Sequence, residues 1–245
     1  MSENNPYFGD DDLVTNTSNR VPFCVCVDIS GSMAKTDPTT GKKPIEELNT
    51  FINELHKYIR ESNGLVDSVE FAIVTFNSEF QVVRDFALCK EEDPEVNLEA
   101  RGGTALAHGV NLALDILEQR KLDFKNNHVD YFQPVLVLVT DGKPGDQEDL
   151  PATAQRTSEA ANNGKLAIFP VVIGSDNDEA KWREITNILS PLSPKHAPMH
   201  LRGLQFDQLM DFLVKSMEQL VISNPDDGKP VATADPDAGG GWGTW

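Results

Sequence analysis

The segment VPFCVCVDISGS, residues 21–32, carries the strongest signal for the fold of the chain. Its first seven residues are almost all apolar, on both of the alternating faces that a strand presents. Such a run is typical of a central strand in a parallel sheet that helices cover on both sides. The run ends at Asp28, and aspartate is unfavourable in strands and costly to bury without a partner. We therefore expect a central strand that delivers Asp28 and two serines to a loop.

Strand-like and helix-like segments alternate through the rest of the chain. Apolar runs predict further strands at residues 69–76, 79–86, 134–139 and 166–173, with a short one near 200–201. Apolar residues at helical spacing predict helices at residues 44–60, 104–120, 149–163, 178–189 and 206–221. Asn77-Ser78 between the second and third strands has hairpin spacing. The order predicts an α/β, Rossmann-like fold: a mostly parallel central sheet with one antiparallel edge strand and helices on both faces.

The two ends of the chain differ in composition from the middle. We expect residues 1–20 to be a flexible acidic segment, residues 21–223 to form one domain, and residues 224–245 to be a flexible tail rich in Gly, Pro and Asp. Trp242 and Trp245 in this tail have two interpretations. They either pack weakly on the domain itself or anchor the tail to a partner.

Charge and cysteine content exclude several classes of protein. Lys and Arg number 21 against 39 Asp and Glu, a formal net charge of −18. This acidity disfavours binding to nucleic acid and to anionic membranes. The three cysteines cannot all pair with one another, and Cys24 and Cys26 suit small buried hydrophobes better than a bridge. Without a signal peptide or an apolar run of about 20 residues, the sequence predicts a cytoplasmic protein.

Polar side chains follow two buried strands at the edge where parallel strands of such folds place ligands. Asp28, Ser30 and Ser32 follow the first strand, and Asp141 follows the strand at 134–139. Between them, a glycine turn delivers Thr104 to a helix start. Taken singly, each of these residues is typical of a helix cap. Taken together, two carboxylates and three hydroxyls suit a hard cation, namely Mg²⁺, with Mn²⁺ or Ca²⁺ as alternatives.

These five residues resemble the metal-ion-dependent adhesion site of von Willebrand factor A domains. The pattern is Asp28-x-Ser30-x-Ser32, then Thr104, then Asp141-Gly142, and the resemblance extends over about residues 21–222. It implies that Ser30, Ser32 and Thr104 ligate the metal directly, while Asp28 and Asp141 act largely through metal-bound water. It also implies a protein partner that supplies an Asp or Glu carboxylate to the open coordination position.

Within this family, two stretches are similar to the bacterial TerY/YegL group, which is associated with tellurium resistance. They are GGTALAHGVNLALDILEQRK, residues 102–121, and VLVTDGKPGD, residues 137–146. Proteins of that group are associated with stress-response loci that also encode a phosphatase and a kinase. The resemblance therefore implies an adaptor in a stress-response or signalling assembly with such partners.

Catalysis is the competing hypothesis. A metal could activate water for hydrolysis, or Ser32 could act as a nucleophile, but no general base is evident besides the ligands themselves. The chain also lacks a nucleotide-binding motif, so in an assembly of ATPase and von Willebrand factor A subunits it would be the accessory subunit. His196 and His200 are interpreted as loop histidines, because Pro194 and Pro198 exclude a zinc-binding helix. We therefore expect a binding module that is not an enzyme.

Overall fold

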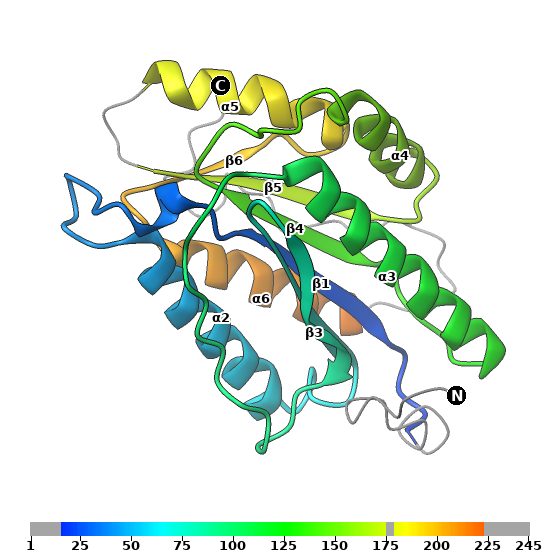
Figure 1. The fold of residues 1–245 in the computed structure, drawn as a ribbon. Coiled ribbons are helices and arrows are strands. Elements are labelled where there is room, and N and C mark those ends of the chain that lie inside the picture. The colour runs from blue at the N-terminus through cyan, green and yellow to red at the C-terminus, as the bar shows by residue number, and fades with distance from the viewer. Residues whose placement is uncertain (1–15, 175–178, 223–245) are drawn as a thin grey trace, which may run out of the picture.

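The computed structural model describes residues 16–174 and 179–222, and within these residues six strands form one sheet (Figure 1). The strand order is β3-β2-β1-β4-β5-β6. All neighbouring pairs are parallel except β2 and β3, which are antiparallel. This arrangement confirms the predicted fold class. The strands are β1 (Val21–Asp28), β2 (Val69–Phe76), β3 (Phe80–Leu88), β4 (Val135–Thr140), β5 (Ala167–Gly174) and β6 (Met199–Arg202).

Helices cover both faces of the sheet (Figure 1). The α-helices are α2 (Pro44–Glu61), α3 (Leu106–Asn126), α4 (Leu150–Asn162), α5 (Glu179–Leu189) and α6 (Phe206–Ile222), with short 3₁₀ helices η1 (Gly31–Ala34) and η2 (Ser190–Leu192). Alternate residues of β1 point to the two faces. Val25 joins the core beneath α2 and α6, whereas Cys24 and Cys26 join the core beneath α3 and α5. All three cysteines are free and buried, as predicted for Cys24 and Cys26, and burial raises the pKa of Cys89 to about 12.

The position of β1 fixes where a ligand can bind. Every residue of β1 is buried, and the strand lies between β2 on one side and β4 on the other. The chain crosses from β1 to β2 on one side and returns, from β3 through α3, to β4 on the other side, which makes the carboxyl ends of β1 and β4 the topological switch point of the sheet. Ligands of open α/β sheets bind at this place.

The opposite end of the sheet holds a buried ionic cluster. The Arg120 guanidinium on α3 donates from Nε to Glu70 Oε2 at 2.6 Å and from Nη2 to Glu70 Oε1 at 2.9 Å. Arg20 adds a second cation, with its Nε 3.5 Å from Glu70 Oε1. Glu70 lies on β2 and is buried together with both arginines. Arg20, the last residue of the segment 1–20 that was expected to be flexible, is therefore packed in this cluster. Residues 1–15 of that segment and the expected tail at 224–245 lie outside the described residues.

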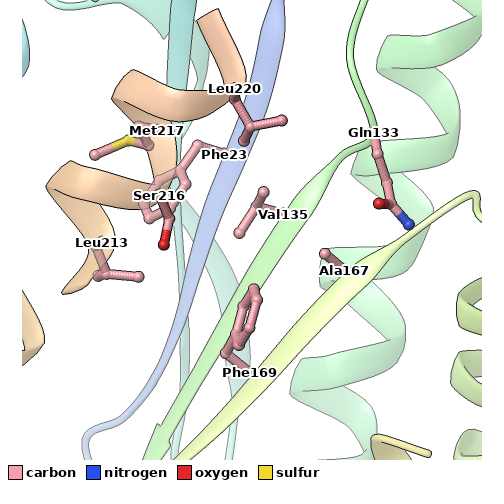
Figure 2. A pocket seen from close by; sticks show the side chains of 9 residues that line it. All are labelled: Phe23, Gln133, Val135, Ala167, Phe169, Leu213, Ser216, Met217 and Leu220. Carbon is pink, nitrogen blue, oxygen red and sulfur yellow. The ribbon is translucent and has the colours of Figure 1, made fainter. Parts of the chain in front are cut away.

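A small cavity lies beneath α6, near the amino ends of β1, β4 and β5. Figure 2 shows that Phe23, Val135 and Phe169 meet Leu213 and Met217 there. Its volume of about 20 Å³ has room for one water molecule and no more. This end of the sheet is thus closed by packing.

Two elements differ from the sequence-based prediction. The helix predicted from Thr104 begins at Leu106, because the backbone of residues 104 and 105 bonds to other loops instead. His200 lies in β6, which confirms the short strand predicted near 200–201, and it is buried, so its interpretation as a loop histidine was wrong. Among the described helices, none is both long and apolar enough to cross a membrane.

Candidate metal site

Asp28 is the buried centre of the site at the carboxyl end of β1. Its Oδ1 accepts a hydrogen bond from the Ser30 amide at 2.7 Å, and its Oδ2 accepts one from the Thr140 hydroxyl at 2.6 Å. Burial, followed by the nearby charge of Asp141, raises the pKa of Asp28 to about 6, although the hydrogen bonds from Thr140 and Ser30 lower it. A carboxylate with these surroundings is stabilised when a cation lies beside it.

The two serines after Asp28 point to the same place although the loop is not extended. Ser30 has extended backbone angles, but Ser32 lies in the 3₁₀ helix η1. Their hydroxyl oxygens are 3.0 Å apart. The Ser32 hydroxyl also donates to Oδ1 of Asp141 at 2.6 Å. The tight turn therefore brings both hydroxyl groups to the carboxyl end of β1.

Asp141 follows β4 directly and is buried. Burial raises the pKa of its carboxyl group, whereas the hydrogen bond from Ser32 and the charges of Lys181 and Lys35 oppose the shift. Asp28 and Asp141 are thus two partly desolvated carboxylates held near each other at one edge of the sheet. Two such groups roughly neutralise a divalent cation.

Backbone hydrogen bonds attach the Thr104 loop to the other two loops. The Gly31 amide donates to the Gly102 carbonyl at 3.0 Å, and the Arg101 amide donates to the Ile29 carbonyl at 2.8 Å. The Gly145 amide, from the loop after Asp141, donates to the Thr104 carbonyl at 2.7 Å. These bonds bring half-buried Thr104 to the same edge without using its side chain, so its hydroxyl is not needed to hold the loop.

Gly102 makes this close approach of loops feasible. Its φ of +76° lies in the left-handed region, which glycine adopts without strain. A Cβ atom at this position would also lie 2.8 Å from the Ser78 hydroxyl oxygen. The glycine turn before Thr104 is therefore required by both backbone angle and space.

The donor set fits a small hard cation. Cis ligands of an octahedral Mg²⁺ ion with bonds of about 2.1 Å lie roughly 3.0 Å apart. The Ser30 and Ser32 hydroxyl oxygens, at 3.0 Å, match that spacing. Within the described residues, no group of three His, Cys, Asp or Glu side chains is placed to hold a metal. A cation at this edge would therefore depend on the hydroxyl groups as well as the two carboxylates.

Sequence reasoning missed the contacts of two residues beside the site. Thr140 donates to Asp28, and the only signal for it was a hydroxyl residue at the end of a buried strand. The second residue is His108, in the first turn of α3. Its Nδ1 lies 2.9 Å from Oδ2 of Asp146, and its ring stacks on Phe80 with centroids 5.3 Å apart. These contacts join three separate segments, so local sequence patterns carry no signal for them.

The family of the chain follows from its sequence and its fold together. Residues 23–143 match the family model of the von Willebrand factor type A domain, a range that includes all five predicted ligands. This region of the chain belongs to the von Willebrand factor type A domain family. Such domains commonly mediate protein–protein interaction and metal-dependent adhesion. No curated protein matches the sequence.

Solved structures of low sequence identity share the fold. A von Willebrand factor type A protein from Catenulispora acidiphila is 18% identical over 82% of this chain and 43% of its own, with a TM-score of 0.57. The pilus adhesin SpaC from Lactobacillus rhamnosus GG is 15% identical over 84% of this chain and 31% of its own, also at 0.57. The domain of the pilus tip protein Mfa5 from Porphyromonas gingivalis is 13% identical over 82% and 97%, at 0.55. The chain spans less than half of the first two proteins, and the likeness concerns the fold alone.

Proposed function

We propose that this protein is a metal-dependent protein-binding module, in which Mg²⁺ at the carboxyl ends of β1 and β4 captures a carboxylate from a partner. Ser30, Ser32 and Thr104 would hold the ion through their hydroxyl groups, and Asp28 and Asp141 largely through water. The bound ion supplies positive charge and a coordination position for an Asp or Glu side chain at the surface of an acidic protein.

The observation that carries the proposal is the chain of contacts from Asp28 through Ser30 and Ser32 to Asp141. The Ser30 amide and hydroxyl, the Ser32 hydroxyl and both carboxylates are linked at distances of 2.6 to 3.0 Å. All of the linked side-chain atoms are oxygens, and they come from two loops that are 109 positions apart at Ser32 and Asp141. A cluster of oxygen atoms that includes two carboxylates is the kind of ligand set that hard cations prefer.

The finer assignment is also part of the proposal. The resemblance to the TerY/YegL group suggests an adaptor in a stress-response or signalling assembly with a phosphatase or kinase as partner. An accessory role beside an ATPase is the alternative for the partner. Hydrolysis is the alternative chemistry, and His108 with Asp146, whose Oδ2 lies 2.9 Å from Nδ1 of His108, is a candidate imidazole and carboxylate pair for it. A hydrolase screen with Asp141→Ala as control would decide between binding and catalysis.

Titration calorimetry with Mg²⁺ and Mn²⁺ tests the proposal. The wild-type chain is expected to bind one ion, and Asp28→Asn, which keeps the shape of the side chain, is expected to lose that heat. Asp149→Asn provides the matched control, because Asp149 is a half-exposed acid on the loop after β4 that none of the five ligands contacts. Equal heats for the wild type and Asp28→Asn would refute the metal site. Capture of partners with and without EDTA then tests whether their binding needs the ion.

A further inference from the structure

Two asparagines hold the segment of residues 94–99 in an extended conformation beside α2. The Asn53 side chain donates to the Val96 carbonyl at 2.9 Å and accepts from the Val96 amide at 2.8 Å. One helical turn earlier, Asn49 makes the same two bonds with Leu98, at 3.0 and 2.8 Å. Each asparagine therefore mimics the neighbouring residue of a β-ladder, and together they pair one edge of this segment.

The other edge of the segment is left unpaired. In extended backbone, the amide and carbonyl groups of successive residues point to opposite sides. Because Val96 and Leu98 face α2, the groups of Glu95, Asn97 and Glu99 face away from it. Within the described part of the chain, no hydrogen bond uses the backbone of these three residues. Their side chains are exposed, so this edge meets solvent.

A groove lies along the segment, with edge strand β3 as its other wall. It has a volume of about 190 Å³ and is lined by Val83 and Arg84 of β3 and by residues 93–98. This volume exceeds the ~150 Å³ that accommodates a benzene-sized group. Val83 is unpaired in a bulge of β3 and is 40% exposed. The Arg84 guanidinium donates hydrogen bonds to the Asp93 carboxylate and to the Ala87 and Leu88 carbonyls. These bonds fix the position of its side chain in the groove.

The charge around the groove selects the kind of occupant. Residues 91–99 contain five acidic side chains and no Lys or Arg. Among these acids, Asp93 is paired with the Arg84 guanidinium at 2.7 Å. The chain's own termini do not complement this charge, because residues 1–15 carry four acids and no base, and residues 223–245 carry four acids and one lysine. A second copy of residues 94–99 would bring like charges together.

We propose that this groove binds an extended, basic segment of a partner protein, which adds a strand to the free edge of Glu95, Asn97 and Glu99. The amides and carbonyls of the partner pair with that edge, its basic side chains lie among Glu91, Glu92 and the other acids, and its alternate apolar side chains contact Val83. Main-chain pairing supplies affinity in such strand addition, and the alternating side chains supply specificity. The hydrogen bonds of Asn49 and Asn53 hold the segment extended, so the free edge has the conformation of a strand without a bound partner.

Residue-resolved amide exchange with synthetic peptides tests this proposal. In the free protein, the amides of Val96 and Leu98 are expected to exchange slowly and those of Glu95, Asn97 and Glu99 rapidly. An acetylated octapeptide of alternating lysine and valine is expected to slow the latter three by about tenfold or more. The same peptide with N-methyl groups on alternate amides keeps its charge but loses about three hydrogen bonds, so it is expected to bind at least about tenfold more weakly.

A pair of variants gives a second readout. Asn97→Pro deletes one donor of the free edge, whereas Asn97→Ala keeps it, and neither touches the asparagine bonds to Val96 and Leu98. The proline variant is expected to bind the lysine–valine peptide about tenfold more weakly than the alanine variant. Circular dichroism and thermal melting establish that both variants are folded.

Four outcomes would overturn the proposal. They are unchanged exchange at the three amides with the peptide in excess, equal binding of the N-methylated peptide, protection by a matched glutamate–valine peptide, or protection by a peptide of residues 223–245. The second outcome would show that charge alone attracts the peptide. The last two would show that the edge takes an acidic strand or the chain's own tail.

Discussion

Ser32 and Asp141 lie 109 positions apart in the chain, and the Ser32 hydroxyl donates a hydrogen bond of 2.6 Å to Oδ1 of Asp141. This bond joins the loop after β1 to the loop after β4 across the switch point of the sheet. A direct hydrogen bond therefore joins two of the five predicted ligands, one from each of these loops.

Two threonines of the site are expected to respond differently to removal of the hydroxyl group. Thr140→Val removes the donor to the buried Asp28 carboxylate, so the free energy of unfolding in EDTA is expected to fall by about 1–3 kcal/mol. Thr104→Val leaves the backbone bonds of its loop intact, so unfolding in EDTA is expected to change by about 0.5 kcal/mol or less. Instead it should reduce the rise in melting temperature that Mg²⁺ causes. Urea unfolding and thermal melting measure both effects.

Gly102→Ala tests the close approach of the loops. A positive φ and a Cβ atom only 2.8 Å from the Ser78 oxygen are expected to lower the free energy of unfolding by about 1–3 kcal/mol. Gly41→Ala is the matched control, because Gly41 has a similar φ of +72° but no atom within 4 Å of the added Cβ. The difference between the two variants isolates the steric contact. Equal losses would mean that strain in the backbone accounts for the whole effect.

Glu70→Ala is expected to be the most destabilising of these changes. It leaves the Arg120 guanidinium buried without its bidentate carboxylate partner and removes the carboxylate beside Arg20. Breaking one partner of a buried ion pair costs about 3–5 kcal/mol. Glu61→Ala, which removes the exposed partner of Arg60 at 3.6 Å, is expected to cost less than about 1 kcal/mol. Chemical denaturation compares them, and a small loss for Glu70→Ala would contradict a structural role of the cluster.

Buried His200 predicts a loss of stability in mild acid. Burial, followed by the charge of Arg202, lowers the pKa of His200 below its ordinary value of 6.5. Its Nε2 lies 2.6 Å from the Thr186 hydroxyl, and its Nδ1 is buried without a hydrogen-bond partner. The unfolded chain therefore binds a proton at a higher pH than the folded chain, and stability falls as the pH drops below about 6.5.

A histidine variant provides the measurement. His200→Gln is expected to flatten the dependence of urea unfolding on pH between about 7 and 5. His128→Asn is the control, because His128 is exposed and asparagine tolerates its positive φ of 55°. An unchanged slope in His200→Gln would show that other groups, such as His56 and His196, whose pKa values are also lowered by burial, dominate the acid response.

The fold was readable from the sequence because its central strands are apolar on both faces. The apolar runs at residues 21–27 and 134–139 predicted a parallel sheet that helices cover on both faces. The hairpin spacing at Asn77-Ser78 predicted the antiparallel edge strand. Four of the candidate ligands were readable because they follow those strands closely, and Thr104 because a glycine turn precedes it. The structure links Asp28, Ser30, Ser32 and Asp141 through contacts. Whether they bind a metal stays a prediction.

The remaining features depend on partners that are distant in the chain. Glu70 accepts a hydrogen bond from Arg120, which is 50 positions away in the sequence, and Asn53 donates one to Val96, which is 43 positions away. In each case the residue itself is unremarkable, and only the packed fold gives it a role. The start of α3 at Leu106 was missed for the same reason, since the Ala105 amide bonds to the Asn77 carbonyl of the hairpin.

Thr140 and Asp141 are consecutive residues at the end of β4, and they serve opposite neighbours: Thr140 donates to Asp28, whereas Asp141 accepts from Ser32. All six residues of β4 are buried, and five of them are aliphatic. A slip of the strand by one residue would therefore exchange one aliphatic side chain for another in the core at little cost. The same slip would place a carboxylate where the Thr140 hydroxyl meets Asp28. The polar end of this strand, and not its apolar body, fixes the alignment of the sheet.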